Sequence, residues 1–162
     1  MYHVFNRGSR KGVLFDTSED YDAFEQLMDD ARRKRPVRIV AYCLMKTHVH
    51  FLLWPTADNA IPAFMKWLMS THAAAFHRRR GSVGQGAVYQ SRYGCVPVED
   101  ARQLFTVWRY VERNALEAGV VSTADEWPWS SAWQGDDTRP PFEVDEGPYE
   151  RPTNWLQILN DY

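Results

Sequence analysis

Two apolar runs joined by a short link constrain the fold of this chain more than any other feature of its sequence. Residues 37–44 and 49–54 are rich in β-branched, aromatic and aliphatic side chains, a composition that favours strands. The linking segment, Met45-Lys46-Thr47, is short enough for a hairpin. We therefore expect two adjacent antiparallel strands, the second of which ends at Pro55.

The segments on either side of this hairpin alternate between strand and helix patterns. A first helix is expected from Ser18, with acidic residues at its positive end, to a basic cluster before Pro36. The other expected elements are a strand over residues 2–6, a helix over residues 61–79, a strand within residues 87–98, and a helix that follows Asp100 and ends at Gly119. A four-stranded antiparallel sheet with two helices on one face buries this order economically. We predict an α+β fold, a ferredoxin-like βαββαβ sandwich extended by the third helix.

The composition changes after Val121, although the 162 residues suit a single compact domain. Residues 135–152 are acidic and rich in proline, and a short apolar segment follows at residues 155–159. We expect a folded domain over residues 1–133 and an irregular acidic tail over residues 134–162 that ends in a short helix.

Charge and hydropathy exclude some classes of protein. No apolar run approaches the roughly 18 residues that a membrane-spanning helix needs, and the N-terminus lacks the pattern of a signal peptide, so we expect a soluble cytoplasmic protein. The net charge of −2 divides into +5 over residues 1–120 and −7 over residues 121–162. A basic body can attract a polyanion, and the acidic residues 135–152 can fold over it and restrain activity. Ordinary solvated surface explains the same charges equally well.

His48-Val49-His50 is the first candidate site. Alternate residues of a strand share one face, so both imidazoles point the same way. Two such imidazoles can chelate one divalent ion and leave coordination positions open for substrate oxygens. Two strand histidines can also be ordinary surface or packing residues, and the pair alone does not decide between these roles.

The second candidate site lies on the third predicted helix. Tyr110 and Asn114 are four residues apart, so they are neighbours on one helical face. A phenol near a bound cation can act as a nucleophile, and the Asn114 amide can offer a neutral oxygen ligand. Arg109 and Arg113 form a second pair with the same spacing and can bind phosphate. Tyr110 can instead be one of the aromatic core residues of this helix.

The chain resembles a known family in five ordered segments. His48-Val49-His50, followed by Phe51-Leu52-Leu53, resembles the histidine–hydrophobic–histidine (HUH) motif of single-tyrosine transposases. Further segments that resemble the same family are residues 2–8, 89–93, 109–121 and 127–131. Together they are similar to the REP-associated tyrosine transposases, relatives of small bacterial insertion sequences. One departure is Ala115, where that family usually has proline after the asparagine.

The resemblance implies a role for each candidate residue. Tyr110 is the expected nucleophile, and His48, His50 and Asn114 are the expected ligands of Mg²⁺ or Mn²⁺. The implied substrate is single-stranded DNA or a DNA hairpin, cut to leave a 5′-phosphotyrosine and a free 3′-hydroxyl. The basic residues expected to contact DNA are Arg7, Arg10, Lys11, Arg78, Arg79, Arg80, Arg92, Arg109 and Arg113. Any one of these charges can equally be solubilising, and His3, His72 and His77 are interpreted as structural.

Two other functions compete with this one. A domesticated module that binds a DNA hairpin without cutting it needs no nucleophile, so the presence of all four site residues favours the enzyme. An RNA-recognition domain of similar fold is disfavoured, because the sequence has none of its aromatic RNA-binding motif. Either a monomer or a homodimer is compatible with the resemblance.

Overall fold

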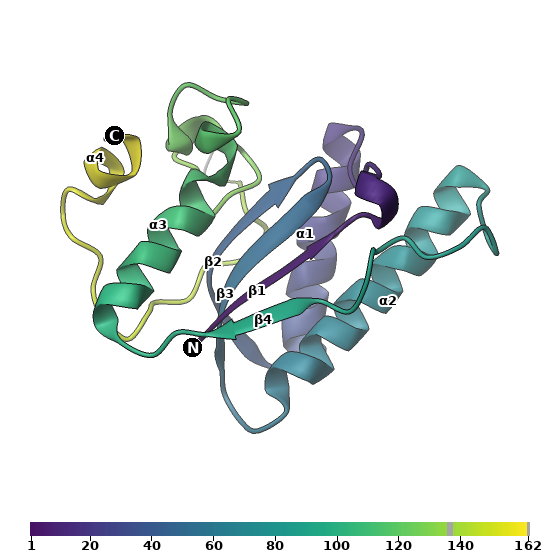
Figure 1. Cartoon of the computed structure of the whole chain (residues 1–162), viewed down its shortest axis with the longest axis horizontal. Helices are drawn as coiled ribbons and strands as arrows, with labels where there is room; N and C mark the ends of the chain where they lie inside the picture. Colours follow the sequence, from purple (N-terminus) through teal and green to yellow (C-terminus); the bar gives the residue numbers. More distant parts are fainter. Residues whose placement is uncertain (136–137, 162) are drawn as a thin grey trace.

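The chain forms a four-stranded antiparallel sheet in the order β2-β3-β1-β4 in a computed structural model, which describes residues 1–135 and 138–161 (Figure 1). The strands are β1 (Tyr2–Arg7), β2 (Val37–Met45), β3 (His48–Pro55) and β4 (Gly94–Pro97). The predicted hairpin is confirmed, since β2 and β3 pair along their length around a two-residue turn. The predicted α+β fold with a four-stranded antiparallel sheet is confirmed as well.

Helices cover both faces of this sheet. The helices are α1 (Ser18–Lys34), α2 (Ala60–Arg80), α3 (Ala101–Glu117) and α4 (Trp155–Asn160), with short 3-10 turns η1 (Ser9–Lys11) and η2 (Ala124–Glu126). Helices α1 and α2 lie side by side on one face, as predicted, and α3 lies on the other face with α4 beside it (Figure 1). No helix among the described residues is long and apolar enough to cross a membrane.

Alternation along β3 sends its side chains into two separate cores. Val49, Phe51 and Leu53 pack with the core under α1 and α2, whereas Leu52 packs under α3. A bulge in β2 between Ile39 and Ala41 shifts the register of the hairpin. Because both faces are covered, β2 and β3 are nearly continuous apolar runs in the sequence.

The helix ends follow the local signals in the sequence. Helix α1 begins at Ser18, and the preceding Thr17 exchanges capping-box hydrogen bonds with Asp20. Helix α3 begins after Asp100, whose side chain accepts a hydrogen bond from the backbone of Gln103 at 2.8 Å. Gly119 follows the end of α3 with a φ of 68°, the conformation that makes glycine a favoured helix terminator.

The predicted strand within residues 87–98 is much shorter than expected, because only β4 at its end joins the sheet. Tyr89 makes one isolated bridge to Gly8. Its side chain turns towards α2, where the hydroxyl lies 2.6 Å from Nδ1 of the buried His72. This tertiary contact draws the first half of the segment away from a regular strand.

The described part of the predicted tail packs on the domain. Phe142 enters the core under α1, and Asp145 exchanges two hydrogen bonds of 2.8 Å with the backbone of Ile39 on β2. Residues 138–147 therefore run along α1 and β2. This part of the chain does not support the hypothesis that the tail covers the basic residues. Two residues of the range in that hypothesis, 136 and 137, lie outside the described residues. Further on, Trp155 and Leu159 enter the core under α3.

Candidate active site

The two predicted site histidines lie on the sheet face that α3 covers. They alternate along β3 with Val49 and Phe51, whose burial in the opposite core fixes the direction in which the imidazoles point. His50 is buried with 8% of its surface exposed, and His48 is partly exposed at the start of the strand. Their ring centroids are 5.2 Å apart, so both imidazoles border one small region.

Helix α3 brings the other two predicted residues to the same region. Asn114 places Oδ1 3.0 Å from Nε2 of His48. The Tyr110 ring lies 5.4 Å from the ring of His50, centroid to centroid, and Tyr110 remains 41% exposed. The structure thus brings together the four site residues that the sequence predicted. The role of each of them stays a prediction.

His3, which the sequence analysis interpreted as structural, also belongs to this cluster. Its Nε2 lies 3.0 Å from Nδ1 of His50, and its ring is 5.6 Å from the ring of Tyr110. His3 reaches them because β1 pairs with β3 in a register that sets it opposite Leu52. The register of this non-sequential pair is the signal that places His3, and no local pattern supplies it.

Burial favours the neutral form of two imidazoles in this cluster, His50 and His3. The pKa of His50 is lowered to about 3, mainly by burial and to a smaller extent by the neighbouring His48, His3 and Arg7. Burial also lowers the pKa of His3. A neutral imidazole has a free ring nitrogen, which is the form that binds a metal.

The donor set fits a divalent ion such as Mg²⁺ or Mn²⁺. Two ligands side by side in an octahedral shell with bonds of about 2.1 Å are about 3 Å apart. The 3.0 Å separation of His48 Nε2 and Asn114 Oδ1 matches this spacing. No group of three or more His, Cys, Asp and Glu side chains able to hold a metal occurs within residues 1–135 and 138–161, so the set depends on the Asn114 amide.

Most of the basic residues expected to contact DNA are exposed. Arg7 lies at the end of β1 opposite His48, on the strand positions that alternate with the buried Val4 and Asn6, and so on the site's face of the sheet. The remaining exposed residues of this kind are Arg10, Lys11, Arg78, Arg79, Arg80 and Arg92. We call Arg10, Lys11 and Arg78–Arg80 the basic end.

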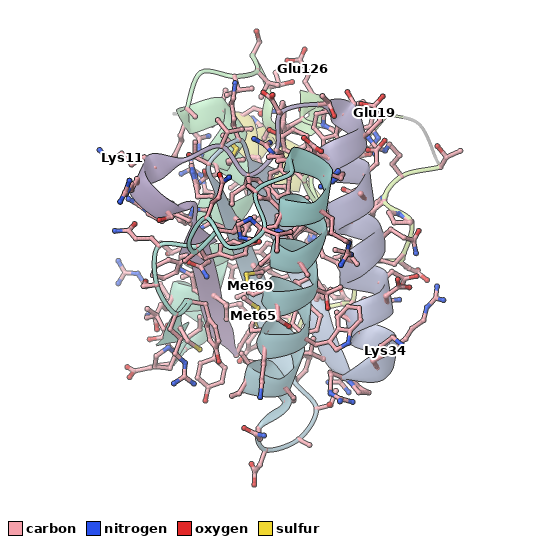
Figure 2. The ribbon with its side chains drawn as sticks, turned by 90° about the vertical axis from the view of Figure 1, so that its right-hand side faces the viewer. Lys11, Glu19, Lys34, Met65, Met69 and Glu126 are labelled. Carbon is pink, nitrogen blue, oxygen red and sulfur yellow. The ribbon has the colours of Figure 1, made fainter. Side chains whose placement is uncertain are left out.

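The basic end gathers η1 and the last turn of α2 near the start of α1. Arg79 forms an ion pair of 2.6 Å with Asp20 in the first turn of α1. Figure 2 shows Lys11 on η1 at the same end of the molecule as Glu19, and Lys34 towards the other end of α1. These cations, far apart in the sequence, thus lie at one end of the molecule, where Arg79 is already paired with Asp20.

Arg109 and Arg113, which the sequence predicted to contact DNA, hydrogen-bond to the C-terminal segment. Arg109 donates hydrogen bonds to the carbonyls of Ile158 at 2.9 Å and Asp161 at 2.6 Å. Arg113 is buried and donates to the carbonyls of Leu159 and, at 3.0 Å, Asp161. Both guanidinium groups thus anchor the C-terminal segment at α4, and their contact with DNA stays a prediction.

The buried carboxylate of Glu112 connects α3 to segments that follow it in the chain. Glu112 has no exposed surface and accepts hydrogen bonds from Ser131 at 2.7 Å and from the indole of Trp155 at 2.7 Å. Arg151 pairs with it at 3.0 Å.

Ala115, the departure from the family pattern, is buried within the continuous helix, so α3 runs unbroken past Asn114.

Comparisons with known proteins match this chain to a transposase family. The model of the family described as "Transposase IS200 like" matches residues 1–114. A Haemophilus influenzae protein that carries the name REP-associated tyrosine transposase is 22% identical over 132 residues, which are 74% of this chain and 75% of that protein.

Two solved structures share the fold. One, of a REP-associated tyrosine transposase bound to a REP hairpin, superposes with a TM-score of 0.66 at 18% identity and covers 92% of each chain. The other, a Deinococcus radiodurans protein described as a transposase, has a TM-score of 0.50 at 24% identity over 68% of this chain and 87% of that one.

Proposed function

The chain belongs to the family of IS200-like transposases, and from that premise we propose that it cuts and rejoins single-stranded DNA through a 5′-phosphotyrosine intermediate on Tyr110. The observation that carries the proposal is the convergence of four side chains from two elements. β3 presents His48 and His50, and α3 presents Asn114 and a Tyr110 that remains open to a substrate.

Tyr110 supplies the nucleophile in this proposal. Its hydroxyl oxygen forms a bond to the phosphorus of the scissile phosphodiester while the bond from phosphorus to the 3′-oxygen breaks. The phenol loses its proton to solvent, which reaches it because Tyr110 is 41% exposed, and the departing 3′-oxygen takes a proton up. The products are a free 3′-hydroxyl and a 5′-phosphate linked to Tyr110. Attack of a 3′-hydroxyl on that linkage joins strands without ATP.

His48, His50 and Asn114 are the residues that would hold Mg²⁺ or Mn²⁺. When bound, such an ion stabilises the negative charge that develops on the attacked phosphate. The chain's own contribution is to hold the ligand atoms still: β3 is paired on both sides, and the sheet face of α3 is buried in the core. Because the proposed ligands are imidazoles and an amide oxygen, they add no negative side chain that would repel phosphate.

We propose a DNA hairpin as the partner of this chain. The support is the basic end, together with Arg7 on the site's own face, because cations spread over one end suit the backbone of a folded strand. A structural neighbour of 92% mutual coverage is itself bound to a REP hairpin. Phosphate contacts of this kind give affinity and orientation, whereas sequence choice needs contacts to the bases.

The test is covalent capture of DNA by the purified protein. Labelled single-stranded hairpin oligonucleotides from the DNA beside the gene are incubated with Mg²⁺, Mn²⁺ or EDTA and resolved on a denaturing gel. We expect a metal-dependent protein–DNA band that Tyr110→Phe abolishes. The matched control is Tyr149→Phe, since Tyr149 is also exposed, at 52%, but lies on the C-terminal segment. Tight binding without a covalent band under any metal would overturn the proposal in favour of a hairpin-binding module.

A further inference from the structure

The ring nitrogens of the two site histidines are not equally free. Nδ1 of His48 lies 3.2 Å from the Thr47 hydroxyl, and Nδ1 of His50 lies 3.0 Å from Nε2 of His3. Neither Thr47 nor His3 belongs to the proposed ligand set. In both histidines it is therefore Nε2 that remains for an ion, and in His48 this is the atom that faces Asn114.

The contact to His50 requires a proton on one of its two nitrogens, either Nδ1 of His50 or Nε2 of His3. A hydroxyl both donates and accepts, so Thr47 tolerates a proton on either nitrogen of His48. A neutral imidazole has one protonated and one free nitrogen. If Nδ1 of His50 carries the proton and donates it to His3, then Nε2 of His50 has its lone pair available for a ligand bond.

The sheet fixes the partner in place. His3 lies inside β1, where it pairs with Leu52 of β3 and Val96 of β4, and Phe5, two residues further on, pairs with His50. The His3 and His50 rings are inclined by only 17° to each other, an arrangement compatible with a hydrogen bond between ring edges. A side chain set by two flanking strands orients its partner more firmly than one on a loop.

We propose that His3 is a positioning residue, which accepts a hydrogen bond from the Nδ1–H group of His50 and so directs Nε2 of His50 towards the metal ion. This inference rests on the proposed function, in which His50 is a ligand. His3 itself does not touch the ion. Partners of this kind fix the orientation and tautomer of a ligating histidine, and their loss typically weakens metal binding 10–100-fold.

A purely structural role for His3 makes a different prediction. Its ring also contacts Phe5 at 5.0 Å and the edge of Tyr110 at 5.6 Å, centroid to centroid. Those contacts need an aromatic ring and no nitrogen. His3→Phe keeps the ring and removes the acceptor, whereas His3→Gln removes the ring and keeps an acceptor, so the two variants separate the two roles.

The first measurement is Mn²⁺ binding to the protein without DNA, by isothermal titration calorimetry. We expect His3→Phe to raise the dissociation constant 10–100-fold and His3→Gln to recover most of that loss. His77→Phe is the matched control and should bind as the wild type does, because His77 lies on α2 and pairs with Ser82 at 2.8 Å. Thermal unfolding without metal confirms that each variant is folded. Wild-type affinity in His3→Phe, or equal losses in His3→Phe and His3→Gln, would overturn the inference.

A second measurement separates this inference from the proposed function. If wild type and His48→Ala alike fail to bind Mn²⁺, the proposed metal site is wrong. Nitrogen-15 NMR of the metal-free protein then still reports which nitrogen of His50 carries the proton. We expect Nδ1 to carry it in the wild type and in His77→Phe, and a mixture of the two forms in His3→Phe. A proton on Nε2 of His50 in the wild type would refute the role of His3.

Discussion

Trp155→Phe should destabilise the protein far more than the same substitution at Trp133. The Trp155 indole nitrogen donates to Oε2 of Glu112 at 2.7 Å. The other oxygen, Oε1, accepts from Ser131 and Trp108 and pairs with Arg151. Within the described parts of the chain, Trp155 is therefore the only hydrogen-bond donor to Oε2.

The magnitude follows from the state of the acceptor. Glu112 has no exposed surface, so water cannot replace the lost donor. A hydrogen bond to a charged group contributes roughly 1.5–3 kcal/mol, and the missing ring atoms cost about 1 kcal/mol more. We expect the free energy of unfolding to fall by about 3 kcal/mol. The comparison is sharp because the indole nitrogen of Trp133 is buried with no hydrogen-bond partner among the described residues. Trp133→Phe loses no hydrogen bond, and its cost should be about 1 kcal/mol or less.

Urea unfolding at pH 7, followed by circular dichroism, measures both variants on the same scale. Equal losses in the two variants would refute the reasoning, because the indole hydrogen bond would then contribute nothing. A loss below about 1 kcal/mol in Trp155→Phe would refute it too, since a buried carboxylate oxygen cannot lose its donor so cheaply.

Two further predictions concern pH and salt. Burial raises the pKa of Glu25 from 4.5 to about 7, against a hydrogen bond from Tyr42, so the folded protein retains a proton there that the unfolded chain releases. This contribution to stability is fully present below pH 4.5 and is lost as pH rises through 7, so the free energy of unfolding falls by up to about 3 kcal/mol over that range. Urea unfolding at pH 5 and pH 8 should find a smaller fall in Glu25→Gln than in the wild type. Lys11→Ala should weaken hairpin binding and reduce its logarithmic salt slope by about 1, and an unchanged slope in binding titrations would exclude a phosphate contact.

The elements that sequence predicted well are those whose signals are local. The β2–β3 hairpin follows from two apolar runs and a short link, and the ends of α1 and α3 follow from capping residues and Gly119. The strand expected within residues 87–98 is confirmed only over β4, and the first half of the segment differs because the partner of Tyr89 is His72 on α2. No local sequence pattern within residues 87–98 predicts that contact.

The candidate site divides in the same way. His48 and His50 share a face by strand alternation, and Tyr110 and Asn114 by helical spacing, so each pair is predictable alone. Their convergence needed the fold, and the sequence reached it through a family resemblance. His3 was missed because its meaning depends on the register between β1 and β3, which are separated by a helix and a strand.

The placement of Tyr110 depends on chain beyond the segment that defines the family. The family match ends at Asn114, within α3. Yet Arg109 and Arg113, on either side of Tyr110, are held by carbonyls of residues 158–161, and Glu112 is held by Trp155. The helix that carries the proposed nucleophile is thus fixed between the sheet on one side and the C-terminal segment on the other. Substitutions in α4 should therefore alter the geometry at Tyr110 without contacting it, because Arg109, Glu112 and Arg113 lie on the same stretch of α3 as Tyr110 and transmit any shift to it.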